Sequence, residues 1–162
     1  MEDLGTAFSI ARRGSWPAHE MAEVAGVCLL DYDARLLRRR RLATRSGDRF
    51  LVNLDQTLSV EDGDAFLLEG GGYIAIEAAP ENLLRVRGPD LVRLAWHIGN
   101  RHTPCQIGPE YLLIQAEAII AHMLEHFGAR TEPVTAPFTP EGGAYGHGRT
   151  QAHAHGATAH AH

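Results

Sequence analysis

The chain has 162 residues, 44% of them apolar, and a formal net charge of -5, so it can bury the core of one domain or of two small ones. The acidic balance disfavours a nucleic-acid partner. No apolar run approaches the roughly 18–20 residues of a membrane span, and the N-terminus lacks a basic-then-apolar signal. The two cysteines, Cys28 and Cys105, are far apart, which is typical of reduced thiols. We therefore expect a cytoplasmic protein with no nucleic-acid and no membrane partner.

The first half of the chain carries short apolar segments separated by turns. Residues 1–23 indicate mostly loop with at most one short strand. After them the pattern predicts strands separated by turn residues such as Ser46-Gly47-Asp48, with a glycine-rich hairpin at 69–72. No helical periodicity interrupts this part, so we expect a small all-β domain over residues 1–79. The expected strands cover residues 24–30, 36–44, 49–54, 65–68 and 73–76.

Four consecutive arginines, Arg38 to Arg41, lie in one expected strand. Successive side chains on a strand point to opposite faces, so at most two of the four share a face. With a net charge of -5 we interpret this strand as solvated or as facing an acidic protein partner.

The second half mixes strands and helices. A helix is expected from Asp90, with an apolar stripe at Leu91, Leu94, Ala95 and Ile98 and a stop at Gly99-Asn100. A second helix ends at Gly128, and a last strand containing Pro133 should lie at a sheet edge. The order is β-α-β-β-α-β, the ferredoxin-like pattern, with two helices on one face of a four-stranded antiparallel sheet. We expect this α+β domain over residues 80–140.

Ten histidines are the compositional outlier. His102 follows the first helix, and if helical geometry persisted to it, its side chain would lie near the apolar stripe. Two readings stay open: a semi-buried histidine with satisfied hydrogen bonds, or a metal ligand that meets its own copy across a two-fold axis. His97 points away from the stripe, which favours its interpretation as a surface or packing histidine. His122 and His126 are spaced for chelation, but a solvated pair is the simpler interpretation.

The last residues, 141–162, read as a flexible tail with too little apolar surface to fold alone. Glycine-rich residues lead into two His-x-His pairs, and His-rich tracts are typical of metal binding. Interspersed Ala, Gly and Thr argue against an affinity tag. The candidate ligands in this tail are His147, His153, His155, His160 and His162. A mobile set of imidazoles suits metal transfer or buffering better than catalysis.

Enzymatic motifs are missing from the sequence. A metal-dependent hydrolase would need a carboxylate or thiolate near the histidines to act on water. Glu110 and Glu141 are the nearest carboxylates, without a catalytic motif around them, and Cys105 lies in an apolar context that favours an inert thiol. No nucleophile elbow or phosphate-binding glycine loop is present. We expect a protein that is not an enzyme, and the remaining alternative is a general Zn, Cu or Ni buffering or storage protein.

Two segments resemble a known family. Residues 96–104, WHIGNRHTP, are similar to the HLGNRH-x-P signature of the urease accessory nickel metallochaperones, the UreE family. Residues 136–146, APFTPEGGAYG, resemble that family's second signature, which a His-rich tail commonly follows. The β module, the β-α-β-β-α-β order and the tail occur in the family's order, from about residue 20 to 162.

The resemblance implies a function and a site. The family has an N-terminal domain for partner or peptide binding and a ferredoxin-like metal domain. It works as a homodimer that holds one Ni2+ at the subunit interface through the second histidine of the first signature, here His102, from each chain. Tail histidines join it, with His147 best placed, and Zn2+ or Cu2+ would also bind. The nickel passes through an accessory GTPase into apo-urease. Ala116 and Ala118 replace a peripheral His-x-His of some members, so that site should be absent.

Overall fold

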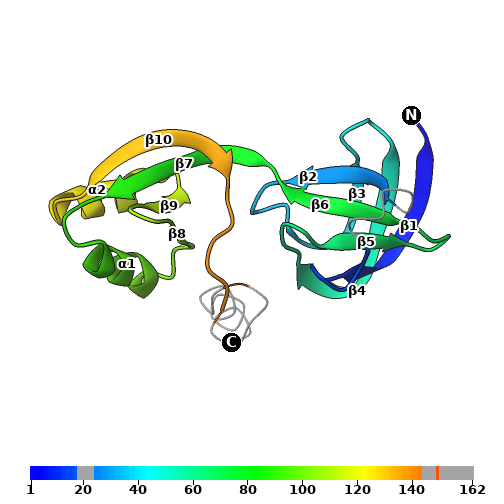
Figure 1. Cartoon of the computed structure of the whole chain (residues 1–162), viewed down its shortest axis with the longest axis horizontal. Helices are drawn as coiled ribbons and strands as arrows, with labels where there is room; N and C mark the ends of the chain where they lie inside the picture. The colour runs from blue at the N-terminus through cyan, green and yellow to red at the C-terminus, as the bar shows by residue number, and fades with distance from the viewer. Residues whose placement is uncertain (18–23, 144–148, 150–162) are drawn as a thin grey trace, which may run out of the picture. The chain divides into compact units, whose positions relative to one another are not determined.

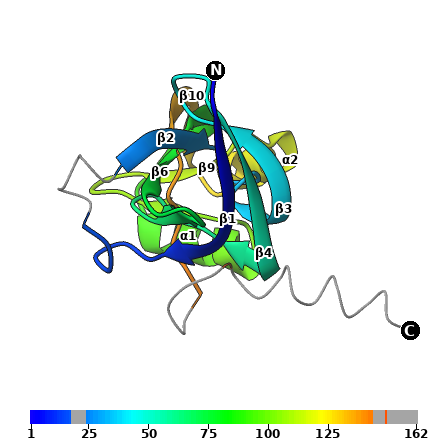
Figure 2. The same cartoon turned by 90° about the vertical axis from the view of Figure 1, so that its right-hand side faces the viewer.

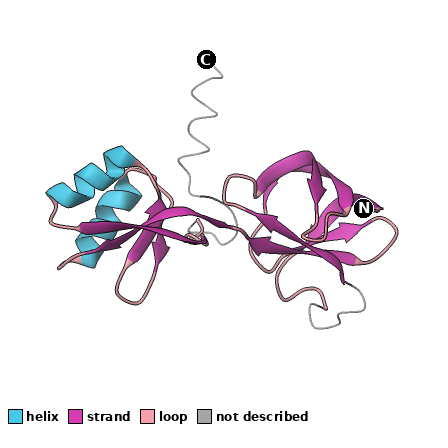
Figure 3. Cartoon of the chain, turned by 90° about the horizontal axis from the view of Figure 1, so that it is seen from above, coloured by secondary structure: helices cyan, strands magenta, loops and turns pink. Residues whose placement is uncertain are grey.

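The computed structural model describes residues 1–17, 24–143 and 149, and the chain divides into two compact units, Met1–Ala79 and Pro80–His162. Strands predominate, and both helices of the described residues lie in the second unit (Figure 3). The fold is therefore mixed α+β. The tail candidates His147, His153, His155, His160 and His162 lie outside the described residues.

Six strands form one sheet in the first unit, in the spatial order β2-β6-β5-β1-β4-β3. Figure 2 shows β1 beside β4 in this sheet. Its core is built by apolar residues that alternate along the strands, among them Phe50, Val52 and Ile74, which have no exposed surface. The described residues of this unit contain strands and no helix, as the sequence predicted. The strands are β1 (Asp3–Ala11), β2 (Val24–Leu30), β3 (Leu36–Ala43), β4 (Arg49–Ser59), β5 (Ala65–Leu68) and β6 (Tyr73–Ala78).

The N-terminal segment differs from the prediction of a mostly looped stretch. β1 is nine residues long and lies between β4, which it pairs in parallel, and β5, which it pairs antiparallel. Gly5 has a φ of +95°, and the register shifts on both sides of the strand, so its pairing is irregular. Pairing with neighbours distant in sequence forms this strand where the local pattern is weak.

Two other predictions for the first unit are confirmed. β5 and β6 form the expected antiparallel hairpin, and Gly71 and Gly72 take φ values of +93° and +89°, which favour glycine. Arg38 to Arg41 are all exposed on β3, an edge strand, and none forms an ion pair with another described residue. Exposure on both faces fits a solvated strand.

The second unit has a four-stranded sheet in the order β10-β7-β9-β8, with every neighbouring pair antiparallel (Figure 1). Residues of β7 and β9 that share one face, such as Val86 and Ile114, pack with both helices in a single core. The elements are β7 (Pro80–Arg87), α1 (Leu91–Asn100), β8 (Gln106–Ile107), β9 (Leu112–Gln115), α2 (Ala118–His126) and β10 (Arg130–Pro137). β10, which contains Pro133, is an edge strand, as predicted.

The apolar stripe of α1 packs as the periodicity predicted. Leu94 and Ile98 are buried, and Leu91 and Ala95 pack against the same core. The helix begins at Asp90, whose carboxylate accepts a hydrogen bond from the Arg93 backbone N–H at 3.1 Å. The stripe thereby fixes the direction in which α1 presents its C-terminal end.

Candidate metal centre at the end of α1

His102 lies in the turn that ends α1, and its backbone φ is +58°. Its N–H donates to the carbonyl of Gly99 at 2.9 Å, and the N–H of Thr103 donates to the carbonyl of Ile98 at 3.3 Å. These two bonds define a Schellman motif, in which the left-handed residue is usually glycine. Among the described residues, His102 is the one non-glycine residue with a positive φ. A β-carbon in this conformation costs roughly 1–2 kcal/mol.

The structure confirms one prediction at this end of α1 and corrects another. The helix ends at Asn100, where the Gly99-Asn100 stop was expected, and His102 is the left-handed residue that follows the Arg101 cap. Because the backbone leaves the helix there, the His102 side chain does not continue the apolar stripe, and the residue is exposed in the single chain. The reading of a semi-buried histidine within one subunit is therefore wrong. The turn leaves the imidazole accessible to a partner or a metal.

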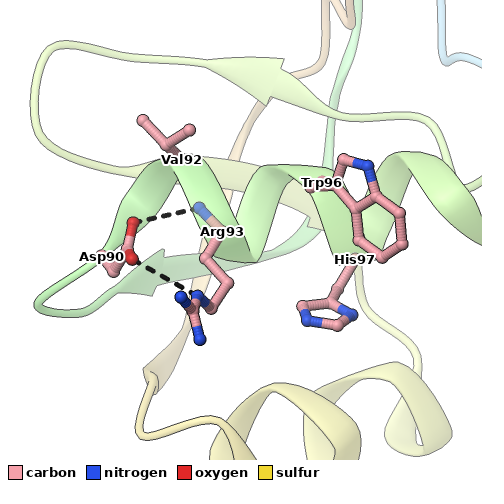
Figure 4. Close-up of a pocket in the computed structure, with 5 residues that line it drawn as sticks. All are labelled: Asp90, Val92, Arg93, Trp96 and His97. Carbon is pink, nitrogen blue, oxygen red and sulfur yellow. Dashed lines mark hydrogen bonds and ion pairs between the residues drawn. The ribbon is translucent and has the colours of Figure 1, made fainter.

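His97 has a different environment. Its ring stacks on Phe127 with centroids 4.0 Å apart and an angle of 18° between the planes, and Trp96 meets it edge-on at 5.1 Å. Figure 4 shows the ring pointing away from Val92. These contacts give His97 a packing role between α1 and the end of α2.

The exposed face of α1 carries two large apolar side chains beside polar ones. Val92 and Trp96, one helical turn apart, are 83% and 62% exposed, an unusual degree for large apolar side chains. With Asp90, Arg93 and His97 they line an open hollow of about 450 Å³ (Figure 4). This face and His102 belong to the same helix and the turn that ends it.

The chain that follows β10 returns to the segment after α1. β10 and β8 are opposite edges of the sheet, yet the backbone N–H of Thr139 donates to Oε1 of Gln106 at 2.8 Å and that of Glu141 donates to the carbonyl of Cys105 at 2.9 Å. Phe138 is completely buried in this crossing. Two segments distant in sequence are thus joined close to His102.

Cys105 has a thiol whose pKa is raised to about 11, chiefly by burial and further by the Glu141 carboxylate. Its Sγ lies 3.9 Å from the carbonyl oxygen of Gln106. The thiol is therefore protonated at neutral pH, which agrees with the prediction of an inert cysteine. Cys28 is buried as well, and burial raises its pKa to about 11.

The ligand set within one chain is incomplete over the described residues. Among residues 1–17, 24–143 and 149, no three His, Cys, Asp or Glu side chains gather closely enough to hold a metal ion. His122 and His126 are exposed on α2, as the solvated-pair interpretation predicted.

Comparison with known proteins identifies the family. The model of the UreE urease accessory protein C-terminal domain matches residues 81–162, and that of the N-terminal domain matches residues 15–79. The chain is 55% identical over 153 residues to the urease accessory protein UreE of Ruegeria pomeroyi, covering 94% of this chain and 99% of that protein. It is 47% identical over 156 residues to UreE of Cereibacter sphaeroides, covering 96% and 83%.

The chain belongs to the UreE family of urease accessory proteins. The resemblance of the two signatures is thereby confirmed. UreE proteins are accessory chaperones and not enzymes, which agrees with the prediction from the sequence. No helix in the described part of the chain is long and apolar enough to cross a membrane.

Reasoning from the sequence missed two features of this UreE chain. The left-handed conformation of His102 was not predicted, because Gly99 already supplied a conventional signal for the end of the helix. The Gln106 contact has no local signal, because its partner Thr139 is 33 residues away. The one available signal was the resemblance of residues 136–146 to the second family signature, which marks this segment without saying what it contacts.

Proposed function

We propose that this protein is a nickel metallochaperone that works as a homodimer in the cytoplasm and donates Ni2+ during assembly of the urease active site. One ion is held at the subunit interface by His102 from each chain, with His147 completing the set and His153, His155, His160 and His162 acting as weaker capture ligands. Its partners are the accessory GTPase and the apo-urease complex. The ion is cargo, and the protein's task is to bind and release it.

The observation that carries this proposal is the conformation of His102. An exposed imidazole is held on a left-handed turn where glycine is the unstrained choice. Backbone strain of this kind persists where a side chain is needed for function. Imidazole nitrogen is a preferred ligand for nickel and neighbouring divalent metals.

The dimer is supported by the face of α1. Val92 and Trp96 are exposed apolar residues on the helix whose end carries His102. A second copy that covers this face about a two-fold axis removes their apolar surface from water and brings two His102 side chains together. A two-histidine centre also explains why the described residues of one chain hold no complete site.

The tail is within reach of the centre. Cys105 and His102 are three residues apart, so their Cα atoms are at most about 11 Å apart. Glu141 is hydrogen-bonded to Cys105, and the six residues from Glu141 to His147 span at most roughly 20 Å. We assign the ferredoxin-like unit, residues 80–140, to metal binding and dimerisation, residues 141–162 to metal capture, and residues 1–79 to partner binding.

Nickel titration combined with sedimentation tests the proposal. We expect one tight Ni2+ for every two chains, further weak sites, and a dimer in solution. His102→Ala should abolish the tight site. A tight site with one ion per monomer, or one that survives this substitution, would contradict the assignment.

A general divalent-metal buffer is the competing function. Imidazole ligands alone give no selectivity for nickel over copper, because copper binds such sites more tightly in vitro. Metal analysis of protein purified from its own cells separates the two. Nickel together with co-purifying urease components supports the chaperone, and a mixture of zinc and copper without them supports the buffer.

A further inference from the structure

Residues 138–141, which lead into the tail, are held by two hydrogen-bond acceptors that we call the clamp: the side chain of Gln106 and the backbone carbonyl of Cys105. Gln106 lies on β8, four residues after His102, and its Oε1 accepts the hydrogen bond from the backbone N–H of Thr139 at 2.8 Å. Next to it, the carbonyl of Cys105 accepts the N–H of Glu141 at 2.9 Å. Buried Phe138 precedes both contacts. Residues 138–141 are therefore held at three points.

Because of the clamp, the tail begins at the edge of the sheet opposite to the one where β10 ends. β10 ends at Pro137 on one edge, and β8 is the opposite edge of a sheet four strands wide. Neighbouring strands are about 4.8 Å apart, so the two edges are separated by roughly 14 Å. Without the clamp the tail would start at Pro137, whereas with it the tail starts beside Cys105, on the side where His102 lies.

The two halves of the clamp differ in how they depend on the sequence. A backbone carbonyl at position 105 is present whatever the side chain, so the bond from Glu141 needs no particular residue. The bond from Thr139 needs an acceptor on the side chain at position 106. A glutamine supplies a neutral carbonyl oxygen and reaches the N–H from a half-buried position.

We propose that Gln106 is a positioning residue for metal capture. By holding residues 138–141 against β8 it sets the effective concentration of the tail histidines at His102. The inference rests on the proposed function, because it concerns how the tail joins that metal site. It assigns a role to a residue that is not itself one of the proposed metal ligands.

The size of the effect follows from the length of the tether. From Glu141 the first tail histidine, His147, is six residues away, and from Pro137 it is ten. Effective concentration falls roughly as the −3/2 power of tether length, so lengthening alone lowers it about twofold, and the displaced origin lowers it further. We expect Gln106→Ala to free Thr139 and, with it, the neighbouring Glu141 bond, and so to weaken nickel affinity by at least about twofold.

Nickel titration of the full chain in two backgrounds tests this role. Gln106→Ala and Gln106→Glu, which keeps an acceptor oxygen, are compared with the parent, first with the tail intact and then with its histidines replaced. The second background carries His147→Ala, His153→Ala, His155→Ala, His160→Ala and His162→Ala. We expect Gln106→Ala to weaken binding only where the tail histidines are present, and Gln106→Glu to retain the parent affinity. Equal losses in both backgrounds would show that Gln106 acts on the fold or on His102, and no loss in either would also overturn the proposal.

Amide hydrogen exchange of the metal-free protein tests the clamp independently of nickel. The amides of Thr139 and Glu141 should be protected in the parent, and both should lose protection in Gln106→Ala while the amides of β9 keep theirs. If Glu141 stays protected, the Cys105 carbonyl holds the segment alone and Gln106 does not set the tail's origin. If the clamp behaves as expected but the parent binds no nickel, the proposed function fails and the anchoring of the segment stands.

Discussion

The two helices of the second unit end in the same backbone motif with opposite residue choices. At the end of α2 the left-handed residue is Gly128, with φ +85°, and its N–H and that of Ala129 donate to the carbonyls of Glu125 and Leu124 at 3.0 Å each. At the end of α1 the equivalent residue is His102, with φ +58°. The hydrogen bonds correspond one to one, so the comparison isolates the side chain at the left-handed position.

The difference supports the proposal that the end of α1 serves function, whereas the end of α2 serves stability. Glycine takes the left-handed conformation without a steric penalty, so the end of α2 is the relaxed form of the motif. Histidine in the same place raises the energy of the backbone and gains no packing, because the residue is exposed. It adds an accessible imidazole at a fixed point, at the end of the helix that carries exposed Val92 and Trp96.

The largest effect is expected for His102→Ala. Alanine removes the imidazole and leaves the left-handed turn strained. We expect the tight nickel site to disappear, with a loss of at least about a hundredfold in affinity. Isothermal titration with nickel measures this. His126→Ala, an exposed histidine at the end of α2, is the control and should leave the tight site unchanged.

A smaller loss is expected for His147→Ala. This histidine is the first of the tail after the segment that is fixed beside Cys105, so its tether is the shortest. We expect nickel affinity to fall by roughly tenfold, with the dimer intact. His162→Ala, at the far end of the tail, is the matched control and should change the affinity less. An equal effect of both would show that position along the tail is unimportant.

Gly128→His tests how much a side chain at the left-handed position costs in stability. A β-carbon at φ +85° should lower the free energy of unfolding by about 1–2 kcal/mol. Gly99→Ala is the matched control, because Gly99 is helical with open space around it, and there alanine should stabilise by up to about 1 kcal/mol. Urea denaturation measures both changes. Destabilisation by both variants would mean that left-handed geometry is not the cause.

The smallest effect concerns the thiol that follows α1. Because the pKa of Cys105 lies above its ordinary 9.0, at about 11, folding favours the protonated form. This contribution to stability is complete below about pH 9 and is lost as the pH rises through 11. Alkylation by iodoacetamide at pH 7.5 should be slower in the folded chain than in urea at both cysteines, and slowest at Cys28, which is 1% exposed. A fast reaction at Cys105 would indicate a thiolate suited to metal binding.

The sequence predicted the repeating local features well and the non-local ones poorly. The stripe of α1, the glycine end of α2 and the edge position of the Pro133 strand follow from residue type and spacing. Residues 1–23 were expected to be mostly loop with one short strand at most, and the length and pairing of β1 were not predicted, because its partners β4 and β5 are distant in sequence. The sequence named His102 as a candidate ligand. It did not predict that this residue is exposed, because helical geometry was extended past the end of α1.

The role of His102 is tested most directly by the His102→Gly variant, in which both the nickel affinity and the free energy of unfolding are measured. Glycine relaxes the left-handed turn and removes the imidazole in one change. We expect the tight nickel site to be lost while the free energy of unfolding of the metal-free protein rises by about 1 kcal/mol. A variant that keeps the tight site, or one that loses it because the protein is destabilised, would contradict the claim that His102 holds its strained position in order to bind metal.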